Sequence, residues 1–242
     1  MSARALLLRG LAAGLVAGLA AFVVASAVGE PQVEAAVALE GAGATGGGIP
    51  RDLQATWGLL TATTAVGLAL GGAVALVVAG TLGRLGRLRP GQSTALVTLL
   101  GFVSVALVPF LKYPASPPGV HDGETIGQRT ALFFGFVLVS VAAAALATRG
   151  ALWVRQRVGT YGGVVAGVTG YLVVVVLAGQ VLAPAEGTGD FPADTLWSFR
   201  LASFVTVATL WGVIGLVLTG LVSRLDAVET APAARRETVA GL

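Results

Sequence analysis

The sequence contains no cysteine, and its only methionine is residue 1. Without cysteine the chain has no disulfide framework, no thiolate metal ligand and no cysteine nucleophile. The lack of further methionines removes the thioether ligands that soft metal ions prefer, which argues against soft-metal transport. Charged residues are scarce too, at 11% of the chain against 55% hydrophobic residues. This leaves too little polar surface to cover a soluble globule of 242 residues.

The hydrophobic residues are gathered into long runs, and the mean hydropathy of the chain is +0.87. A run of about 18 or more apolar residues is long enough for a helix to cross a lipid bilayer. Six such runs are present, at residues 5–28, 54–80, 93–111, 130–148, 161–183 and 196–222. We therefore predict an all-α, polytopic integral membrane protein with six transmembrane helices in a single transmembrane domain, residues 1–242.

Charges alternate between the connecting segments. One set carries most of the basic residues: Arg4, Arg9, Arg84, Arg87, Arg89, Arg149, Arg155, Arg157, Arg224, Arg235 and Arg236. The other set carries the carboxylates Glu30, Glu34, Glu40, Asp52, Asp122, Glu124, Glu186, Asp190 and Asp194. Because cytoplasmic loops are rich in Lys and Arg, the alternation predicts cytoplasmic N- and C-termini and an acidic outer face in the inner or plasma membrane of the cell. Membrane orientation, rather than nucleic-acid binding, then explains the basic pI of 9.9.

The first apolar run has a second interpretation. Arg4 and Arg9 precede it and the small residues Ala25, Ser26 and Ala27 follow, as in a cleavable signal peptide. Cleavage would leave five helices. The run is about 20 residues long, whereas the apolar region of a signal peptide is typically about 7 to 15, so an uncleaved helix is favoured.

Glycine recurs at every fourth position in two of the predicted helices. The first series is Gly10, Gly14 and Gly18, and the second is Gly159, Gly163 and Gly167. This spacing places the glycines on one helix face, which lets a neighbouring backbone approach closely in lipid. The pattern predicts tight helix packing, either within one subunit or in a homo-oligomer.

No catalytic constellation is present. His121 is the only histidine, and the phosphate-binding, zinc-protease and serine-nucleophile motifs are absent. We therefore expect neither an enzyme nor a bound cofactor. The predicted outer segments instead offer carboxylates, one imidazole and the carbonyl groups of many Gly and Pro residues, which suit a divalent cation of hard or borderline character.

The segment between the third and fourth predicted helices is rich in proline, with Pro109, Pro114, Pro117 and Pro118. Proline fixes backbone dihedrals, so a defined conformation is expected. Lys112 and Arg129 lie at its edges, and His121, Asp122 and Glu124 place three possible metal ligands within four positions. The alternative is a rigid outer cap whose charges are solvated.

The segment after the first predicted helix presents Glu30, Glu34 and Glu40. In a helix Glu30 and Glu34 are one turn apart and share a face near the outer surface. Paired carboxylates there would raise the local cation concentration. Alternatively, Glu30 precedes Pro31 simply as an N-terminal helix residue that interacts with the helix dipole.

Residues 29–40 and, more strongly, residues 112–130 resemble the signature segments of the CbtA family of cobalt transporter subunits. In the family pattern, GEP precedes an alanine-rich stretch ending in Glu, and LKYPANPPxVGDPxTI precedes an Arg-Thr pair. The chain reads LKYPASPPGVHDGETI from Leu111, followed by Arg129 and Thr130. Tyr113, Pro114, Pro117 and Pro118 match this pattern, whereas Ser116, His121 and Gly123 depart from it. The departure at His121 puts an essential role for the histidine in doubt.

The resemblance implies a membrane subunit that moves Co²⁺ inward for cobalamin synthesis, together with a small, single-helix, histidine-rich partner of the CbtB type. On this basis Glu30, Glu40 and Asp122 are expected to form or border the site where Co²⁺ enters, with His121 and Glu124 as further candidates. A structural anchor for a metal-binding partner and a transporter of another solute remain as alternatives. Arg200, about one turn into the sixth predicted helix, is expected to pair with Asp194 or Glu30.

Overall fold

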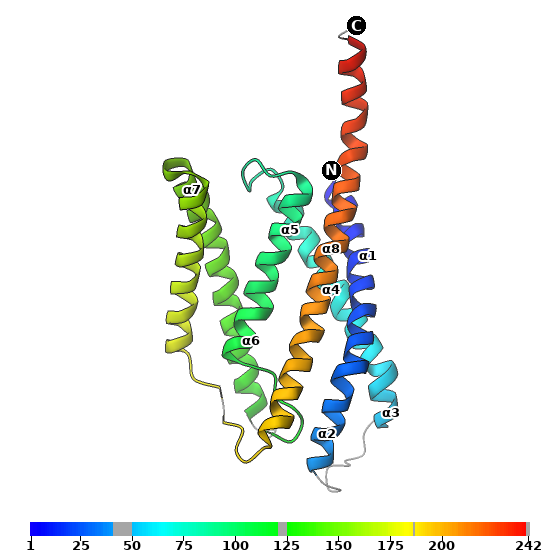
Figure 1. Ribbon diagram of the computed structural model, residues 1–242, viewed down its shortest axis with the longest axis vertical. Coiled ribbons are helices and arrows are strands. Elements are labelled where there is room, and N and C mark those ends of the chain that lie inside the picture. The colour runs from blue at the N-terminus through cyan, green and yellow to red at the C-terminus, as the bar shows by residue number, and fades with distance from the viewer. Residues whose placement is uncertain (41–49, 121–124, 186, 241–242) are drawn as a thin grey trace. The chain divides into compact units, whose positions relative to one another are not determined.

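A computed structural model of the chain describes residues 1–40, 50–120, 125–185 and 187–240, without the side chains of residues 40 and 231–240. Most of the residues in these ranges are helical, and none of them lies in a β-strand. The α-helices are α1 (Ala3–Val24), α2 (Glu30–Glu40), α3 (Arg51–Leu53), α4 (Leu59–Thr81), α5 (Pro90–Gly101), α6 (Val108–Lys112), α7 (Ile126–Val181) and α8 (Ala193–Ala240) (Figure 1). The all-α class predicted from the sequence is confirmed.

Three short segments of wider, π-type helix join some of these helices without a break. They are η1 (Ala25–Gly29) between α1 and α2, η2 (Gln54–Gly58) between α3 and α4, and η3 (Phe102–Leu107) between α5 and α6. In η1 the backbone N–H of Glu30 donates to the carbonyl of Ala25, five residues earlier. The chain therefore continues as one long helix through each of these segments.

Five of the resulting helices are long and apolar enough to cross a membrane: Ala3–Leu39, Arg51–Thr81, Pro90–Lys112, Ile126–Val181 and Ala193–Thr230. The first, second, third and fifth each contain one apolar run predicted from the sequence. The fourth contains two of them, residues 130–148 and 161–183. The structure is thus that of a multi-pass membrane protein, and within α7 the two predicted runs lie on either side of the non-helical residue Gly159.

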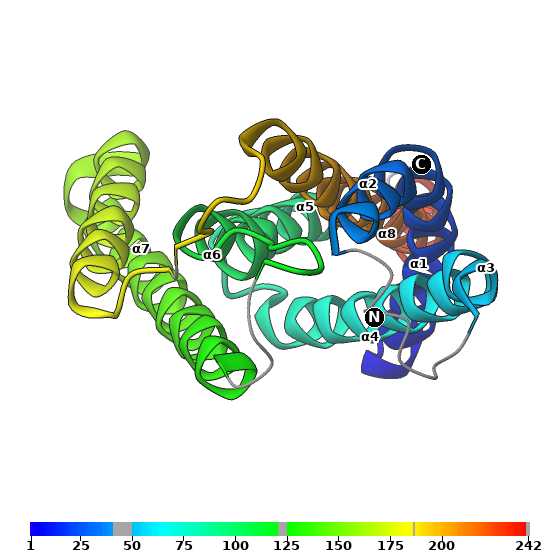
Figure 2. The ribbon, with the colours of Figure 1, turned by 90° about the horizontal axis from the view of Figure 1, so that it is seen from below.

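Gly159 divides α7 into two arms, residues 126–158 and 160–181. Its φ of 83° and ψ of 177° lie outside the helical region, in a conformation that glycine adopts without strain. The two arms run side by side in both ribbon views (Figure 1 and Figure 2). Near the turn they touch closely, because a Cβ atom added at Gly163 would lie 2.6 Å from the carbonyl oxygen of Ala151. Gly159 is therefore the turn of a helical hairpin rather than part of a packing face.

The chain forms two compact units. Unit 1 comprises Met1–Phe22, Trp57–Leu99 and Thr209–Leu242, and unit 2 comprises Val23–Thr56 and Leu100–Ala208. The prediction of a single transmembrane domain over residues 1–242 stays a prediction.

In unit 1, α1 and α4 pack backbone against backbone. A Cβ atom at Gly14 would collide with the carbonyl of Gly67, and one at Gly18 would lie 2.7 Å from the carbonyl oxygen of Thr63. The glycine spacing in α1 thus serves close packing within one chain. Of the two possibilities left open by the sequence, packing within a subunit is the one seen for this series. The last part of unit 1 adds α8 against α5, where Gly215 faces the side chain of Thr98.

Unit 2 has its apolar core between the arms of α7, where Phe136, Ala143 and Val175 are buried together. The hydroxyls of Ser140 and Tyr171 join the arms by a hydrogen bond of 2.8 Å. Phe204 of α8 packs on the rings of Phe102 and Phe110, with ring centroids 6.3 and 5.3 Å away. The aromatic contacts hold the start of α8 against η3 and α6.

Candidate functional site

Four described segments that adjoin the polar residues singled out in the sequence lie at one end of unit 2. The end of α2, the segment after α6, the segment after α7 and the start of α8 all lie at this end, at the bottom of Figure 1. The proline-rich segment leaves α6 at Tyr113, where the backbone turns out of the helical conformation. Helix-joining segments from three parts of unit 2 therefore meet at the same end.

Lys112 and Tyr113 tie the start of the proline-rich segment to the end of α7. The Lys112 ammonium donates to the carbonyl oxygen of Leu182 at 3.4 Å, and the Tyr113 hydroxyl donates to that of Ala183 at 2.7 Å. The Tyr113 ring also meets Phe136 edge to face, with centroids 6.0 Å apart. Burial raises the pKa of the Tyr113 hydroxyl, which keeps it neutral and able to donate. These contacts anchor the segment at a fixed place.

Arg200 holds the same segment from the side of α8. Its Nε donates to the carbonyl oxygen of Ala115 at 3.3 Å. Pro117, two residues further on, is buried, while Pro118 is exposed and Pro114 is half-buried. The predicted ion pair of Arg200 with Asp194 or Glu30 is wrong, because the guanidinium contacts a backbone carbonyl instead. A backbone acceptor in an irregular segment leaves no trace in the charge pattern.

Glu30 forms an ion pair with Arg51, which begins α3. The carboxylate is mostly sheltered, with a side-chain exposure of 16%, and Arg51 is more open at 36%. The pair joins the first residue of α2 to the segment that leads into α4. Glu30 is therefore held by a fixed positive charge and is not simply a solvated residue.

Unsatisfied polar atoms accompany this pair. In the described part of the chain, the buried Nε of Arg51 and the buried hydroxyl of Ser26 have no hydrogen-bond partner. Ser26 lies in η1, one helical turn before Glu30. Buried polar groups are usually satisfied, so these atoms mark a place where a water molecule or an ion would find partners.

Comparison with known proteins decides the family. The model of the family described as "Probable cobalt transporter subunit (CbtA)" matches residues 3–223. The chain belongs to the CbtA family. The match covers all of unit 2, including the end described above, and most of unit 1. No curated protein and no solved structure matches the chain.

Membership of the CbtA family makes the chain a transporter subunit, which acts with partner subunits in a membrane. Its five apolar helices fit a multi-pass membrane protein. Transport is not an enzymatic function, in keeping with the absence of catalytic motifs from the sequence.

Only some of the predicted metal ligands lie within the described residues. His121, Asp122 and Glu124 lie outside the described residues, as does the side chain of Glu40. Within the described part of the chain no three His, Cys, Asp or Glu residues form a group that could hold a metal ion. The predicted ligand set stays a prediction, and Glu30 is the one member whose surroundings are defined.

Sequence reasoning missed the role of Arg51. Between residues 29 and 53 it is the only basic residue, among Glu30, Glu34, Glu40 and Asp52. A lone cation in an acidic segment is a signal for an ion pair, although it does not say which carboxylate is the partner. Arg129, at the other edge of the proline-rich segment, lies in the first turn of α7, with its Nε buried.

Proposed function

We propose that this CbtA protein carries Co²⁺ inward across the cell membrane and supplies it for cobalamin synthesis. The family match over residues 3–223 carries the proposal. The acidic segments, which alternate with basic ones along the sequence, supply the electrostatic means to attract a divalent cation.

The proposed topology has six crossings and cytoplasmic termini. The turn at Gly159 supports it, because each arm of α7 is then one crossing and the basic residues Arg155 and Arg157 lie beside the turn. The cysteine-free chain allows a clean test with Ser2→Cys, Arg87→Cys and Gly187→Cys. A membrane-impermeant maleimide should label only Gly187→Cys in intact cells. Labelling of Ser2→Cys in intact cells would contradict the topology.

In the proposed mechanism Co²⁺ collects at the acidic end of unit 2. Glu30, Glu40 and Asp122 supply carboxylate oxygens, with His121 and Glu124 as further ligands, and Co²⁺ accepts such oxygen and imidazole ligands. The ion competes with Arg51 for Glu30, so that the arginine leaves the carboxylate only when a cation arrives. Lys112, Tyr113, Pro114, Pro117, Pro118, Arg129 and Arg200 act as positioning residues that fix the proline-rich segment.

The energy for uptake can come from the membrane potential. A divalent cation that moves inward across about 100 mV gains about 4.6 kcal/mol, at about 2.3 kcal/mol for each charge. The chain has no nucleotide-binding motif. Transport of the cation down the membrane potential needs no nucleotide.

The proposed partner is a small, single-helix protein rich in histidine, of the CbtB type. This chain has one histidine, whereas Co²⁺ binds well to imidazole nitrogen. A partner that supplies the imidazoles would complete the pathway. The proposal predicts that uptake requires both proteins.

The experiment is uptake of radioactive Co²⁺ by cells that lack other cobalt importers and express this chain with the partner. Glu30→Gln, Glu40→Gln and Asp122→Asn should each lower uptake severalfold. Asp226→Asn near the C-terminal end of α8 is the matched control and should leave it unchanged. Wild-type uptake in all three acidic variants would show instead that the chain anchors a partner that itself conducts the ion.

A further inference from the structure

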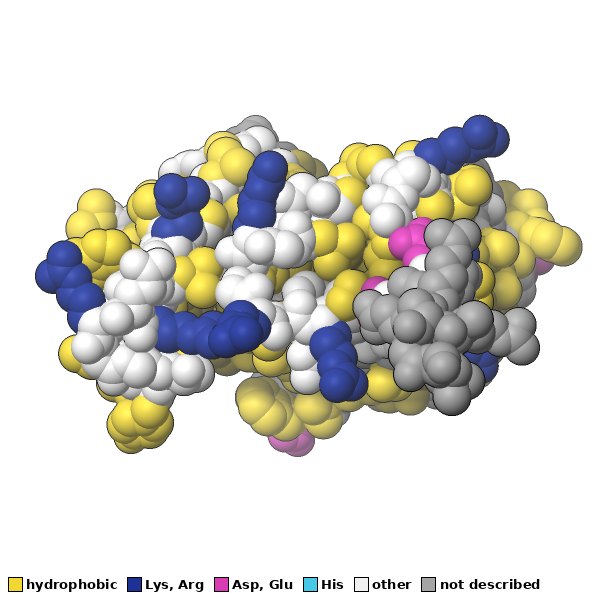
Figure 3. Space-filling view, turned by 90° about the horizontal axis from the view of Figure 1, so that it is seen from above, with side chains coloured by type: hydrophobic (Ala, Val, Ile, Leu, Met, Phe, Trp, Pro, Cys, Tyr) yellow, Lys and Arg dark blue, Asp and Glu magenta, His cyan; other side chains and the backbone are white. Residues whose placement is uncertain are grey.

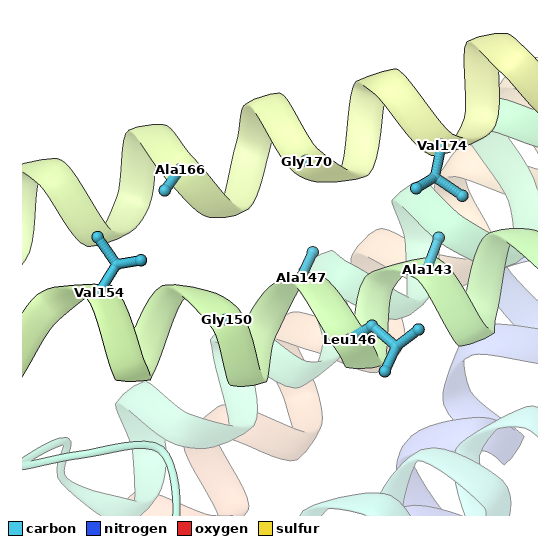
Figure 4. A pocket seen from close by; sticks show the side chains of 8 residues that line it. All are labelled: Ala143, Leu146, Ala147, Gly150, Val154, Ala166, Gly170 and Val174. Atoms are coloured by element: carbon cyan, nitrogen blue, oxygen red, sulfur yellow. The ribbon is translucent and has the colours of Figure 1, made fainter.

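The two arms of α7 enclose an apolar groove. It has a volume of about 300 Å³ and is lined by Ala143, Leu146, Ala147, Gly150, Val154, Ala166, Gly170 and Val174. Figure 4 shows the first five of these on one arm and the last three on the other, facing each other across the groove. Binding sites for small molecules start at about 300 Å³. The groove is therefore large enough to take part of a hydrophobic ligand.

The two arms are held together along the groove. At the turn end, the arms touch where Gly163 meets Ala151 and Arg155. At the far end, the Ser140 and Tyr171 hydroxyls join them. Between these two contacts the arms also touch at Gly167, where a Cβ atom would lie 3.2 Å from the carbonyl oxygen of Ala147, whereas a Cβ atom at Gly150 or Gly170 would have no neighbour within 4 Å. The groove therefore runs beside the line where the arms touch, and Gly150 and Gly170 leave it open.

Positive charge lies at the turn end of the groove. Arg155 follows the lining residue Val154 directly, and Arg157 lies one turn beyond Val154 on the same helix face. The whole of α7 contains no Asp or Glu. In the described part of the chain neither arginine forms an ion pair. In Figure 3 the α7 turn, at the left, carries dark blue basic side chains and no acidic ones.

Aromatic side chains lie beside these arginines. The Arg157 guanidinium lies 3.9 Å from the centre of the Trp153 ring. Trp153 is 54% exposed, and Tyr161 across the turn is 84% exposed. Trp and Tyr favour the level of lipid headgroups, so the turn end is suited to the membrane interface.

We propose that the α7 groove binds an anionic phospholipid, with one acyl chain along the groove and the headgroup phosphate on Arg155 and Arg157. The apolar lining matches an acyl chain. The unpaired arginines match a phosphate, and basic sites between membrane helices recognise anionic headgroups in this way. An apolar helix from another protein would fill the groove but leave both arginines without a counter-charge. The proposal needs only that α7 lies in a bilayer and does not rest on cobalt transport.

The test is native mass spectrometry of the full chain in detergent, with phosphatidylglycerol and phosphatidylcholine of identical acyl chains as probes. Wild-type protein should retain phosphatidylglycerol in clear preference to phosphatidylcholine. The double variant Arg155→Gln/Arg157→Gln should bind it roughly tenfold or more weakly, since each basic residue adds several-fold to binding of anionic lipid. Gly170→Leu, or Ala166→Leu as a second variant, fills the groove and should weaken binding of both lipids.

Two matched controls separate this site from general effects. Arg84→Gln/Arg87→Gln removes two exposed arginines from the segment after α4, and Gly179→Leu adds the same side chain to α7 away from the groove. Both should bind phosphatidylglycerol as the wild type does. Equal binding of the two lipids, or wild-type binding by the arginine or groove variants, would overturn the proposal. So would a disulfide-linked dimer of Gly170→Cys in membranes, because a second copy would then occupy the groove.

Discussion

The α1 and α4 pair in unit 1 and the α7 hairpin in unit 2 both pack on regularly spaced glycines, but in the hairpin two further glycines outside the series face open space. Along α1, added Cβ atoms at Gly10, Gly14 and Gly18 would all collide with α4. Along α7, added Cβ atoms at Gly163 and Gly167 would lie 2.6 and 2.8 Å from the other arm of the hairpin, but at Gly150 and Gly170 there is open space. The lesson is that fourth-residue spacing marks the glycines on which a neighbouring helix packs, whereas glycines outside that spacing, such as Gly150 and Gly170, can face open space.

Gly14→Ala should have the largest effect on this comparison. The new Cβ atom would collide with the backbone carbonyl of Gly67, which has no flexible end to move aside. Forcing an extra methyl group into a packed interface costs about 1 to 3 kcal/mol. We expect the melting temperature in detergent, followed by size-exclusion chromatography after heating, to fall clearly. Gly80→Ala in α4 has no neighbour within 4 Å and serves as the control. Equal melting of the two variants would refute the close packing.

The hairpin offers a second contrast, between Gly163→Ala and Gly170→Ala. The first places a Cβ atom 2.6 Å from the Ala151 carbonyl oxygen, and the second places it in open space. Gly163→Ala should destabilise the protein by about 1 to 2 kcal/mol, whereas Gly170→Ala should stay within about 0.5 kcal/mol of the wild type. The same thermal assay compares them. A loss at Gly170 as large as at Gly163 would mean that the groove is closed.

Tyr113→Phe probes the polar end of unit 2 and should have a smaller effect. It removes the hydrogen bond to the Ala183 carbonyl, which is worth about 0.5 to 1.5 kcal/mol. Limited proteolysis should also cut the proline-rich segment faster, because its anchor to residues 182–183 is lost. Unchanged melting and unchanged cleavage would show that the hydrogen bond does not hold the segment.

The Tyr113 contribution should depend on pH in a defined direction. Burial raises the pKa of its hydroxyl, so the folded protein favours the neutral form. The stabilisation is then fully present below the ordinary tyrosine pKa of about 10 and is lost as the pH rises through the higher folded-state pKa. The difference in stability between wild type and Tyr113→Phe should stay constant from about pH 6 to about pH 9. A difference that disappears within this range would contradict the assignment.

Arg51→Gln should have the smallest effect on stability. Its ion pair with Glu30 is partly exposed, and such pairs contribute about 0 to 1 kcal/mol that salt reduces. Uptake should respond differently, because Glu30 loses a competitor for Co²⁺. We expect uptake at low Co²⁺ concentration to be retained or increased. Loss of uptake with unchanged melting would show that Arg51 itself takes part in the pathway.

Hydropathy alone predicted the helical class, because every apolar run is long enough to identify a membrane helix. It did not predict that runs 130–148 and 161–183 meet at a turn on Gly159, since a glycine with positive φ is no different in sequence from a packing glycine. The Glu30 pair with Arg51 and the Arg200 bond to Ala115 also escaped prediction. Both join segments far apart in the chain, and the second uses a backbone acceptor that charge patterns do not reveal.

The most direct test of the central claim is Co²⁺ influx into proteoliposomes that contain the purified chain, with and without the histidine-rich partner. An imposed inside-negative potential should drive saturable influx when both proteins are present, and Glu30→Gln should reduce it. Influx carried by the partner alone, or no influx with both proteins under the potential, would contradict the proposal that this chain conducts Co²⁺ inward.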